Sequence, residues 1–241
     1  SSDRAAPRIR LWSEAQRQLA GGRVPHLQGN ASRAVCITPF MKKPALGILF
    51  SLLLPMTLQA GSKTETLVLG GGCFWCTEAA YELLPGVLSV ESGYAGGTKA
   101  NPTYKEVCSG DTGHAEVIRI EFDPAKTSAD ALLDYFWEAH DPTTLNRQGA
   151  DVGSQYRSII LYANDKQKDA AEASRAKANE RFGGKVVTEI APLKEFHPAE
   201  VSHQDYFRLN PNAGYCRVVI APKIEKLKKS PAVRGGAEKT M

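Results

Sequence analysis

The segment GGGCFWC, which begins at Gly70, places two cysteines three residues apart directly after a glycine run. We predict a strand over residues 64–69 before it and a helix over residues 74–84 after it, stopped by a Pro-Gly pair. Cys73 then opens a helix, whose unpaired N–H groups and dipole stabilise a negative charge on sulfur. The pattern therefore predicts a reactive thiol of lowered pKa at Cys73, with Cys76 one helical turn later and close enough to form a disulfide with it.

The cysteine count favours redox chemistry over the other uses of a cysteine pair. The chain has five cysteines, an odd number, with one close pair, which fits structural disulfides poorly. A zinc site normally takes four ligands from two such pairs, and Cys108 and Cys216 are each alone in the sequence. We therefore predict no metal site, while a pair of inert buried cysteines remains an alternative.

Composition and pattern indicate one α+β domain. A chain of 241 residues with 42% hydrophobic content can bury one sizeable core. Predicted strands and helices mix without a strict βαβα alternation, which favours a single two-layer α+β domain with irregular loops at 101–113 and 141–153 and a coil-rich C-terminal tail. The predicted strands cover 64–69, 87–94, 114–122, 156–162 and 186–190, and the predicted helices cover 74–84, 165–182, 198–209 and a segment beginning at 127 or 128.

Both ends of the chain differ in composition from this domain. Residues 41–60 show two lysines, an apolar run and a small-residue end, as a secretory signal peptide does. The apolar run is roughly half of the ~20 residues that span a bilayer, so we expect no stable membrane insertion. Residues 1–40 are then upstream sequence or a disordered extension, residues 61–222 the catalytic domain, and residues 223–241 a basic flexible tail. Because the net charge of +4 is concentrated at these ends, we predict no nucleic-acid binding.

Glu116 carries a second chemical signal. In the strand over 114–122, Ile118, Ile120 and Phe122 share one face by alternation, and Glu116 falls on that same face. A carboxylate on an apolar face is costly unless it is neutral or paired, and desolvation raises its pKa, as a proton donor requires. The pattern alone leaves open that the strand edge keeps Glu116 in water.

Other polar residues give weaker signals. Tyr104, Asp151 and Tyr156 lie in or beside polar loops, where each is more often structural than catalytic. The histidines have no partner that spacing identifies, so we treat them as structural. They are His114, His140, His197 and His203.

Eight ordered segments resemble the peptide methionine sulfoxide reductases of the A type. Together they extend over roughly residues 64–223, and so many blocks in order make the resemblance specific. The segments are GGCFWCTE at 71–78, GYAGG at 93–97, YKEVCSG at 104–110, GHAEV at 113–117, HDPTTLNRQ at 140–148, DVGSQYRS at 151–158, HQDY at 203–206 and YC at 215–216.

This resemblance implies a ferredoxin-like α+β domain that reduces the S epimer of methionine sulfoxide, free or in proteins, and so repairs oxidised proteins. It implies that Cys73 is the nucleophile and that Glu116 protonates the sulfoxide oxygen. The remaining implied site residues bind the substrate: Phe74 and Trp75 as the wall around its methyl group, Tyr104 and Tyr156 through hydroxyls on its oxygen, and Asp151 as a carboxylate that organises the site.

The implied mechanism needs thiols and no metal or organic cofactor. Attack by Cys73 leaves a sulfenic acid, a second thiol condenses with it, and thioredoxin reduces the resulting disulfide. Many relatives carry glycine where this chain has Cys76. Spacing favours Cys76 as the resolving thiol and the YC match favours Cys216, so we expect Cys76 to act first and Cys216 to relay the disulfide. We expect Cys108 to be a buried structural thiol.

Two other functional classes compete with this interpretation. A thioredoxin-type thiol–disulfide oxidoreductase also uses a Cys-x-x-Cys pair, but it leaves Glu116, Tyr104 and Tyr156 without a role. A secreted module that binds methionine-rich partners without turnover is the second alternative. With the signal peptide, we expect a monomeric enzyme exported to a bacterial periplasm, where an exported thioredoxin-like protein would replace thioredoxin as reductant.

Overall fold

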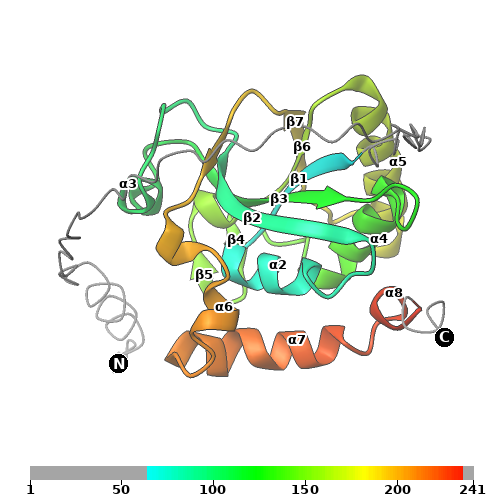
Figure 1. The fold of residues 1–241 in the computed structure, drawn as a ribbon. Helices are drawn as coiled ribbons and strands as arrows, with labels where there is room; N and C mark the ends of the chain where they lie inside the picture. Colours follow the sequence, from blue (N-terminus) through cyan, green and yellow to red (C-terminus); the bar gives the residue numbers. More distant parts are fainter. Residues whose placement is uncertain (1–63, 236–241) are drawn as a thin grey trace, which may run out of the picture. The chain divides into compact units, whose positions relative to one another are not determined.

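The computed structural model describes residues 64–235, which form one compact unit (Figure 1). The sequence predictions for residues 1–40 and 41–60 lie outside the described residues. Within residues 64–235, no helix is both long and apolar enough to cross a membrane. The expectation of one domain that mixes helices and strands is confirmed.

Six strands form the main sheet, in the order β7-β6-β1-β3-β2-β8. Neighbouring strands run antiparallel except for the parallel pair β6–β7. A separate hairpin of two strands, β4 and β5, each two residues long, lies in the predicted loop over 141–153. The strands are β1 (Glu65–Gly71), β2 (Val87–Ala95), β3 (Ala115–Phe122), β4 (Arg147–Gln148), β5 (Asp151–Val152), β6 (Ser158–Tyr162), β7 (Glu189–Pro192) and β8 (Phe196–Pro198).

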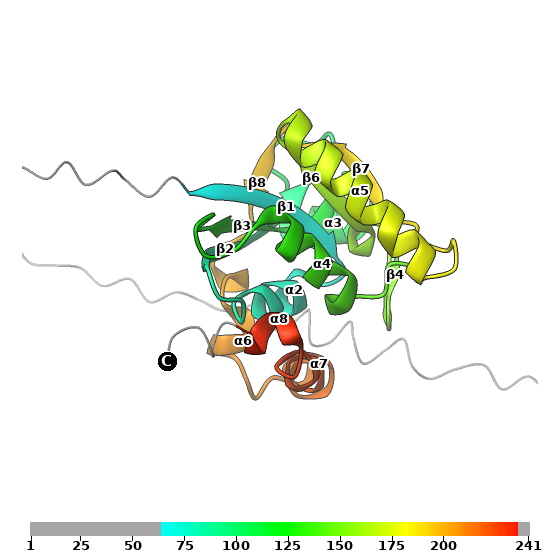
Figure 2. The same cartoon turned by 90° about the vertical axis from the view of Figure 1, so that its right-hand side faces the viewer.

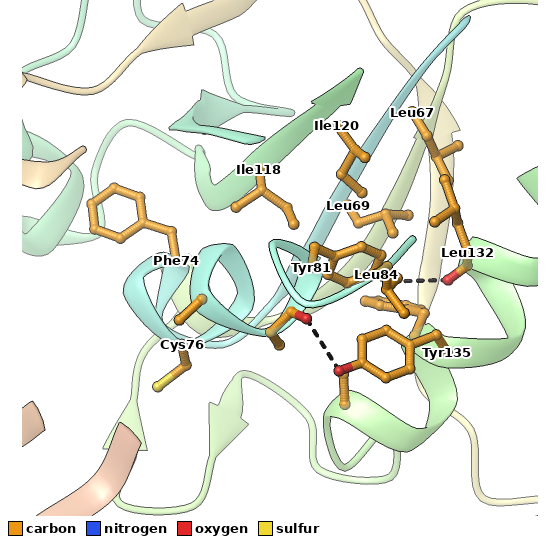
Figure 3. Close-up of a cluster of buried hydrophobic side chains, with 14 of the residues drawn as sticks. Leu67, Leu69, Phe74, Cys76, Tyr81, Leu84, Ile118, Ile120, Leu132 and Tyr135 are labelled. Carbon is orange, nitrogen blue, oxygen red and sulfur yellow. Dashed lines mark hydrogen bonds between the residues drawn. The ribbon is translucent and has the colours of Figure 1, made fainter. Parts of the chain in front are cut away.

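Helices and strands share one main core. Ile118, Ile120 and Phe122 of β3 pack into it, as their alternation predicts. Two phenol hydroxyls cross-link its helices: Tyr81 donates to the Leu132 carbonyl at 2.9 Å, and Tyr135 donates to the Ala80 carbonyl at 3.1 Å (Figure 3). Among the helices that contribute are α2 (Phe74–Tyr81), α4 (Ala129–Ala139) and α5 (Asp165–Arg181).

The alternate residues of β3 form a smaller cluster with residues from β1, β2 and β6. Ala115 and Val117 are fully buried there, covered by the segment that contains Leu193 and Phe196. Glu116 lies between them in sequence and therefore points to the opposite face, toward α2. The predicted face of Glu116 is thus confirmed.

The C-terminal segment is ordered, so the prediction of a coil-rich, flexible tail over 223–241 is wrong for residues 223–235. A π-helical turn (Cys216–Ile220) leads into α7 (Ala221–Leu227), and α8 (Pro231–Arg234) follows. Ile224 and Leu227, three residues apart on one helix face, are each 4% exposed. The surrounding lysines masked this apolar pair in the sequence. Residues 236–241 lie outside the described range.

Helix α7 packs against α2 and so adds a layer beyond a sheet with one layer of helices (Figures 1 and 2). The chain after α7 is held by Ser230, whose hydroxyl donates to Glu138 of α4 at 2.7 Å. The same hydroxyl accepts from the Ala232 N–H at 3.2 Å and thereby caps α8. The C-terminal residues therefore belong to the domain and cover α2.

Two further elements differ from the sequence predictions. The helix predicted over 198–209 is a short 3₁₀ turn (Val201–His203) followed by α6 (Tyr206–Leu209). The loop predicted over 101–113 contains α3 (Tyr104–Ser109), which begins at a capping box formed by Thr103 and Glu106. Both segments border the site described next.

Candidate active site

Cys73 occupies the N-cap of α2, at the end of β1, as the sequence predicts. Its carbonyl accepts the N–H groups of Cys76 at 3.0 Å and Thr77 at 3.2 Å, which begins the helix. The chain turns into the helix at Gly72, whose φ of +97° suits glycine and whose missing Cβ would lie 2.5 Å from the Gln148 side chain. The glycine run therefore permits the tight turn that delivers Cys73 to the helix start.

Glu116 lies directly beneath this helix start. The Phe74 N–H donates to Glu116 Oε2 at 3.0 Å, and Glu116 is 1% exposed. Burial raises its pKa to about 8, and the nearby charges of Asp151 and Cys76 act in the same direction, while the Phe74 N–H opposes them. A solvated Glu116 is excluded, and the carboxyl group is largely protonated at neutral pH.

The two cysteines differ in acidity. The sequence predicted a lowered pKa for Cys73, whereas the structure raises it. Burial raises the pKa of Cys73, and the hydrogen bond with Cys76 and the charges of Glu116 and Asp151 raise it further. The same hydrogen bond lowers the pKa of Cys76, as does the charge of Lys223. The helix start favours a thiolate, but desolvation, the hydrogen bond with Cys76 and the nearby acidic groups outweigh it at Cys73. Cys73 is therefore the thiol that donates its proton toward Cys76.

Tyr104 and Tyr156 lie close to Glu116 and Cys73. Burial raises the pKa of both phenols, and charge on Glu116 and on Cys73 raises each further. Tyr104 stacks on the Phe74 ring with centroids 6.2 Å apart, and its N–H donates to Glu200 at 2.8 Å. Both phenols therefore stay neutral and able to donate hydrogen bonds next to the carboxyl group.

Asp151 reaches Cys76 through Tyr215. The Tyr215 hydroxyl donates to Asp151 Oδ2 at 2.7 Å and lies 3.8 Å from Cys76 Sγ. Burial raises the pKa of Asp151, and the Tyr215 hydrogen bond and Lys223 lower it. The structure thus connects Asp151 to the second cysteine, a link that the sequence did not indicate.

The aromatic wall extends beyond Phe74 and Trp75. Trp75 stacks on Tyr206 with centroids 3.7 Å apart and an interplanar angle of 10°. It also stacks on His203 with centroids 5.6 Å apart, and the His203 ring is tilted against Tyr104. Sequence reasoning assigned no role to Tyr206 and Tyr215 and treated His203 as structural. The signal in the sequence that could have identified these three residues was their position in the segments HQDY (203–206) and YC (215–216). They reach Trp75 only through the tertiary fold.

The other predicted structural histidines keep that role. His140 lies between the Phe136 carbonyl at 2.6 Å and Ser158 Oγ at 2.7 Å, and burial lowers its pKa to about 4. His114 accepts the Gly97 N–H at 3.1 Å. Neither contacts the reacting cysteines.

The remaining described cysteines are also free thiols. Cys216 is fully buried, and burial raises its pKa, as does charge on nearby Cys76. Cys108 is half-exposed rather than buried, and burial raises its pKa to about 11, while a hydrogen bond with Tyr104 lowers it. Cys108 therefore borders the site. Over residues 64–235, no cluster of three or more histidine, cysteine and acidic side chains is placed to hold a metal ion.

Comparisons with known proteins agree with this geometry. The family model described as peptide methionine sulfoxide reductase matches residues 65–234. The chain is 53% identical over 173 residues to peptide methionine sulfoxide reductase MsrA of Halobacterium salinarum, covering 71% of this chain and 98% of that protein. It is 56% identical over 166 residues to the MsrA of Leptospira borgpetersenii, covering 69% and 94%.

Two solved structures share the fold. Methionine sulfoxide reductase A of Corynebacterium diphtheriae superimposes with a TM-score of 0.58 at 38% identity, covering 65% of this chain and 80% of that one. Mxr1 from Saccharomyces cerevisiae in reduced form superimposes with a TM-score of 0.61 at 34% identity, covering 65% and 91%.

The raised pKa of Glu116 makes stability depend on pH. Its folded pKa of about 8 exceeds the reference value of 4.5, so the stability it confers is complete below pH 4.5 and is lost as pH rises through 8. The loss amounts to roughly 5 kcal/mol at most. We expect Glu116→Gln to remove most of this decline in the free energy of unfolding, measured by urea titration from pH 5 to 9. The partly exposed neighbour Glu121 gives the control, Glu121→Gln, and equal slopes in both variants would contradict the prediction.

Proposed function

The chain belongs to the peptide methionine sulfoxide reductase family and reduces methionine sulfoxide, and we propose that it does so with Cys73 as nucleophile and Glu116 as proton donor. The observation that carries the proposal is the Phe74 N–H to Glu116 bond at 3.0 Å, which fixes a protonated carboxyl group beside the residue that follows Cys73. The proposed nucleophile, Cys73, and the proposed acid, Glu116, are therefore both fixed at the N-terminal end of α2.

In the first step, the Cys76 thiolate takes the proton of Cys73, and the Cys73 sulfur attacks the sulfoxide sulfur. Cys76 is the more acidic thiol of the pair, so it is the one that ionises first and can act as the base. The S–O bond breaks as the oxygen moves to Cys73 Sγ and takes the proton of Glu116. Methionine leaves, Cys73 becomes a sulfenic acid, and Glu116 becomes a carboxylate.

The substrate methyl group would lie against Phe74 and Trp75, and the sulfoxide oxygen would accept hydrogen bonds from Tyr104 and Tyr156. Support comes from their common position around Cys73 and Glu116, and from phenols that remain protonated. Fixing both the oxygen and the methyl group leaves one direction for the peptide chain, so the pocket would distinguish the two epimers at sulfur. We assign this site to the S epimer, as the family resemblance implies.

In the second step, the Cys76 thiol condenses with the Cys73 sulfenic acid, forming a disulfide and releasing water. The hydrogen bond between the two thiols supports Cys76, because the two sulfur atoms are already neighbours. Cys216 begins the π-helical turn directly after Tyr215 and lies near Cys76, which suits a later relay of the disulfide toward the surface.

An external dithiol must then reduce the disulfide. We propose thioredoxin, or a thioredoxin-like protein where the enzyme is exported, and we assign no metal or organic cofactor to the reaction. The two protons that the dithiol releases return to Cys73 and to Glu116, and Cys76 is left as the thiolate, so the cycle closes.

Three broader assignments remain proposals. The succession β1-α2-β2-β3-α4-β6 and the strand order β6-β1-β3-β2 support a ferredoxin-like description of the central unit. The pattern of residues 41–60 supports a signal peptide and export, and with it a periplasmic location. We propose a monomer, since the residues assigned to the reaction all come from one chain.

Loss of the nucleophile tests the proposed function. Cys73→Ser should abolish reduction of a peptide with one S-sulfoxide of methionine, assayed with dithiothreitol. Glu116→Gln should lower kcat/KM by roughly 10²- to 10⁴-fold, because the oxygen loses its proton donor. Glu121→Gln should keep the wild-type rate. Full activity of Cys73→Ser would refute the assignment of the nucleophile, and turnover of the R-sulfoxide peptide at the same rate would refute the epimer.

The resolving cysteine is tested by mapping disulfides after one turnover without reductant. We expect a Cys73–Cys76 bond, followed by a Cys76–Cys216 bond on longer incubation. Cys216→Ser should still form the Cys73–Cys76 bond, since the first disulfide does not need Cys216. A Cys73–Cys216 bond with Cys76 free would show that Cys216 resolves first.

Export is tested by expressing the complete chain in a bacterium and sequencing the N-terminus of the protein in the periplasmic fraction. We expect a start close to Gly61. A mature protein that retains residues 1–40, or one found wholly in the cytosolic fraction, would contradict this assignment.

A further inference from the structure

Glu78 is a buried carboxyl group that the reaction does not use. It is 2% exposed and lies on α2 three residues after Trp75, so both side chains lie on the same helix face, and α2 contacts α6. Burial raises its pKa to about 7, while the backbone N–H of Asp205, to which it is hydrogen-bonded, lowers it. A buried carboxylate at this position is costly, which points to a function for it.

The chain segment facing Glu78 is fixed by its neighbours. Gln204 forms a double link to β2: the Ser92 N–H donates to Gln204 Oε1 at 2.9 Å, and Gln204 Nε2 donates to the Ser92 carbonyl at 2.9 Å. Asp205 then adopts a φ of +53°, an unusual conformation for a residue other than glycine. This left-handed turn directs the chain into α6.

The residue after this turn is Tyr206, which stacks on Trp75 at 3.7 Å and is buried. The orientation of Tyr206 follows from the backbone of Asp205, and that backbone is held on one side by Gln204 and on the other by Glu78. A change at Glu78 therefore reaches the aromatic wall through the Asp205 N–H and the next residue along the chain, Tyr206.

We propose that Glu78 is a positioning residue, which holds Tyr206 against Trp75 through the Asp205 N–H and thereby sets the affinity of the pocket for its substrate. This inference rests on the proposed function, because it takes Trp75 as part of the substrate pocket. Glu78 itself touches neither the substrate nor the reacting sulfur atoms.

The charged groups around Glu78 determine which form binds the turn. Glu82, on the same helix, and Asp205 both disfavour the carboxylate, and Arg208 pairs with Asp205 at 2.6 Å. The carboxylate is the form that the Asp205 N–H stabilises. Protonation of Glu78 weakens its hydrogen bond with the Asp205 N–H. The turn at Asp205 is therefore held more firmly above about pH 7 than below it.

Glu78→Gln tests the role with little change in volume. We expect KM for the S-sulfoxide peptide at pH 8 to rise about 5- to 10-fold, the effect of replacing a hydrogen bond to a carboxylate by one to a neutral amide oxygen, with kcat changed less than about twofold. In a Tyr206→Leu background the same substitution should raise KM no further. A fall in kcat at constant KM, or effects of the two substitutions that multiply, would overturn the proposal.

A measurement without substrate separates this proposal from the reaction mechanism. Trp75 fluorescence, in a protein with the native residue at 78 and with Trp12 and Trp137 replaced by Phe in every sample, should change with a midpoint near pH 7. The transition should disappear in Glu78→Gln and persist in Glu116→Gln. If it persists in Glu78→Gln, another group such as His203 causes it, and the proposal fails. Should Cys73→Ser remain active, the proposed mechanism fails while this transition still decides the role of Glu78.

Discussion

The hydrogen bond from the Phe74 N–H to Glu116 is the contact on which the site depends. It joins the first turn of α2 to the start of β3, and thus ties the helix that begins at Cys73 and contains Cys76 to the strand that carries Glu116. An N–H group at a helix start needs an acceptor, and here the acceptor is a group that burial keeps protonated. The same bond therefore satisfies the backbone and positions the proton donor.

The packing around α2 determines how strongly Glu116 and Cys73 are desolvated. Seven of the eight residues of α2 are buried, so the helix start is held in place by packing as well as by its hydrogen bonds. Water is excluded, which raises the pKa of Glu116 and of Cys73 together. Such a site needs a neighbour that accepts the Cys73 proton, and Cys76 provides it one turn later. The second cysteine thus serves the first step as well as the disulfide.

Local pattern was enough to place Cys73 and Glu116, the residues to which we assign the chemistry. Alternation in β3 placed Glu116 on the buried face, and glycines before a helix placed Cys73 at its N-cap. Pattern failed where distant segments meet. The acidity of Cys73 depends on Asp151 and Glu116, and the wall beside Trp75 depends on Tyr206, which lies 131 residues further along the chain. Helix α7 was missed because lysines surround its single apolar pair, Ile224 and Leu227.

That missed helix bears on the chemistry. Cys76 and Glu78 belong to α2, and the segments that contact α2 from the C-terminal part of the chain are α6 and α7. Without this cover, both side chains would be hydrated and their charged forms would no longer be selected by burial and by local partners. Lys223 of α7 also lowers the pKa of Cys76. Through Lys223, the basic C-terminal segment is therefore part of the electrostatic environment of the two cysteines.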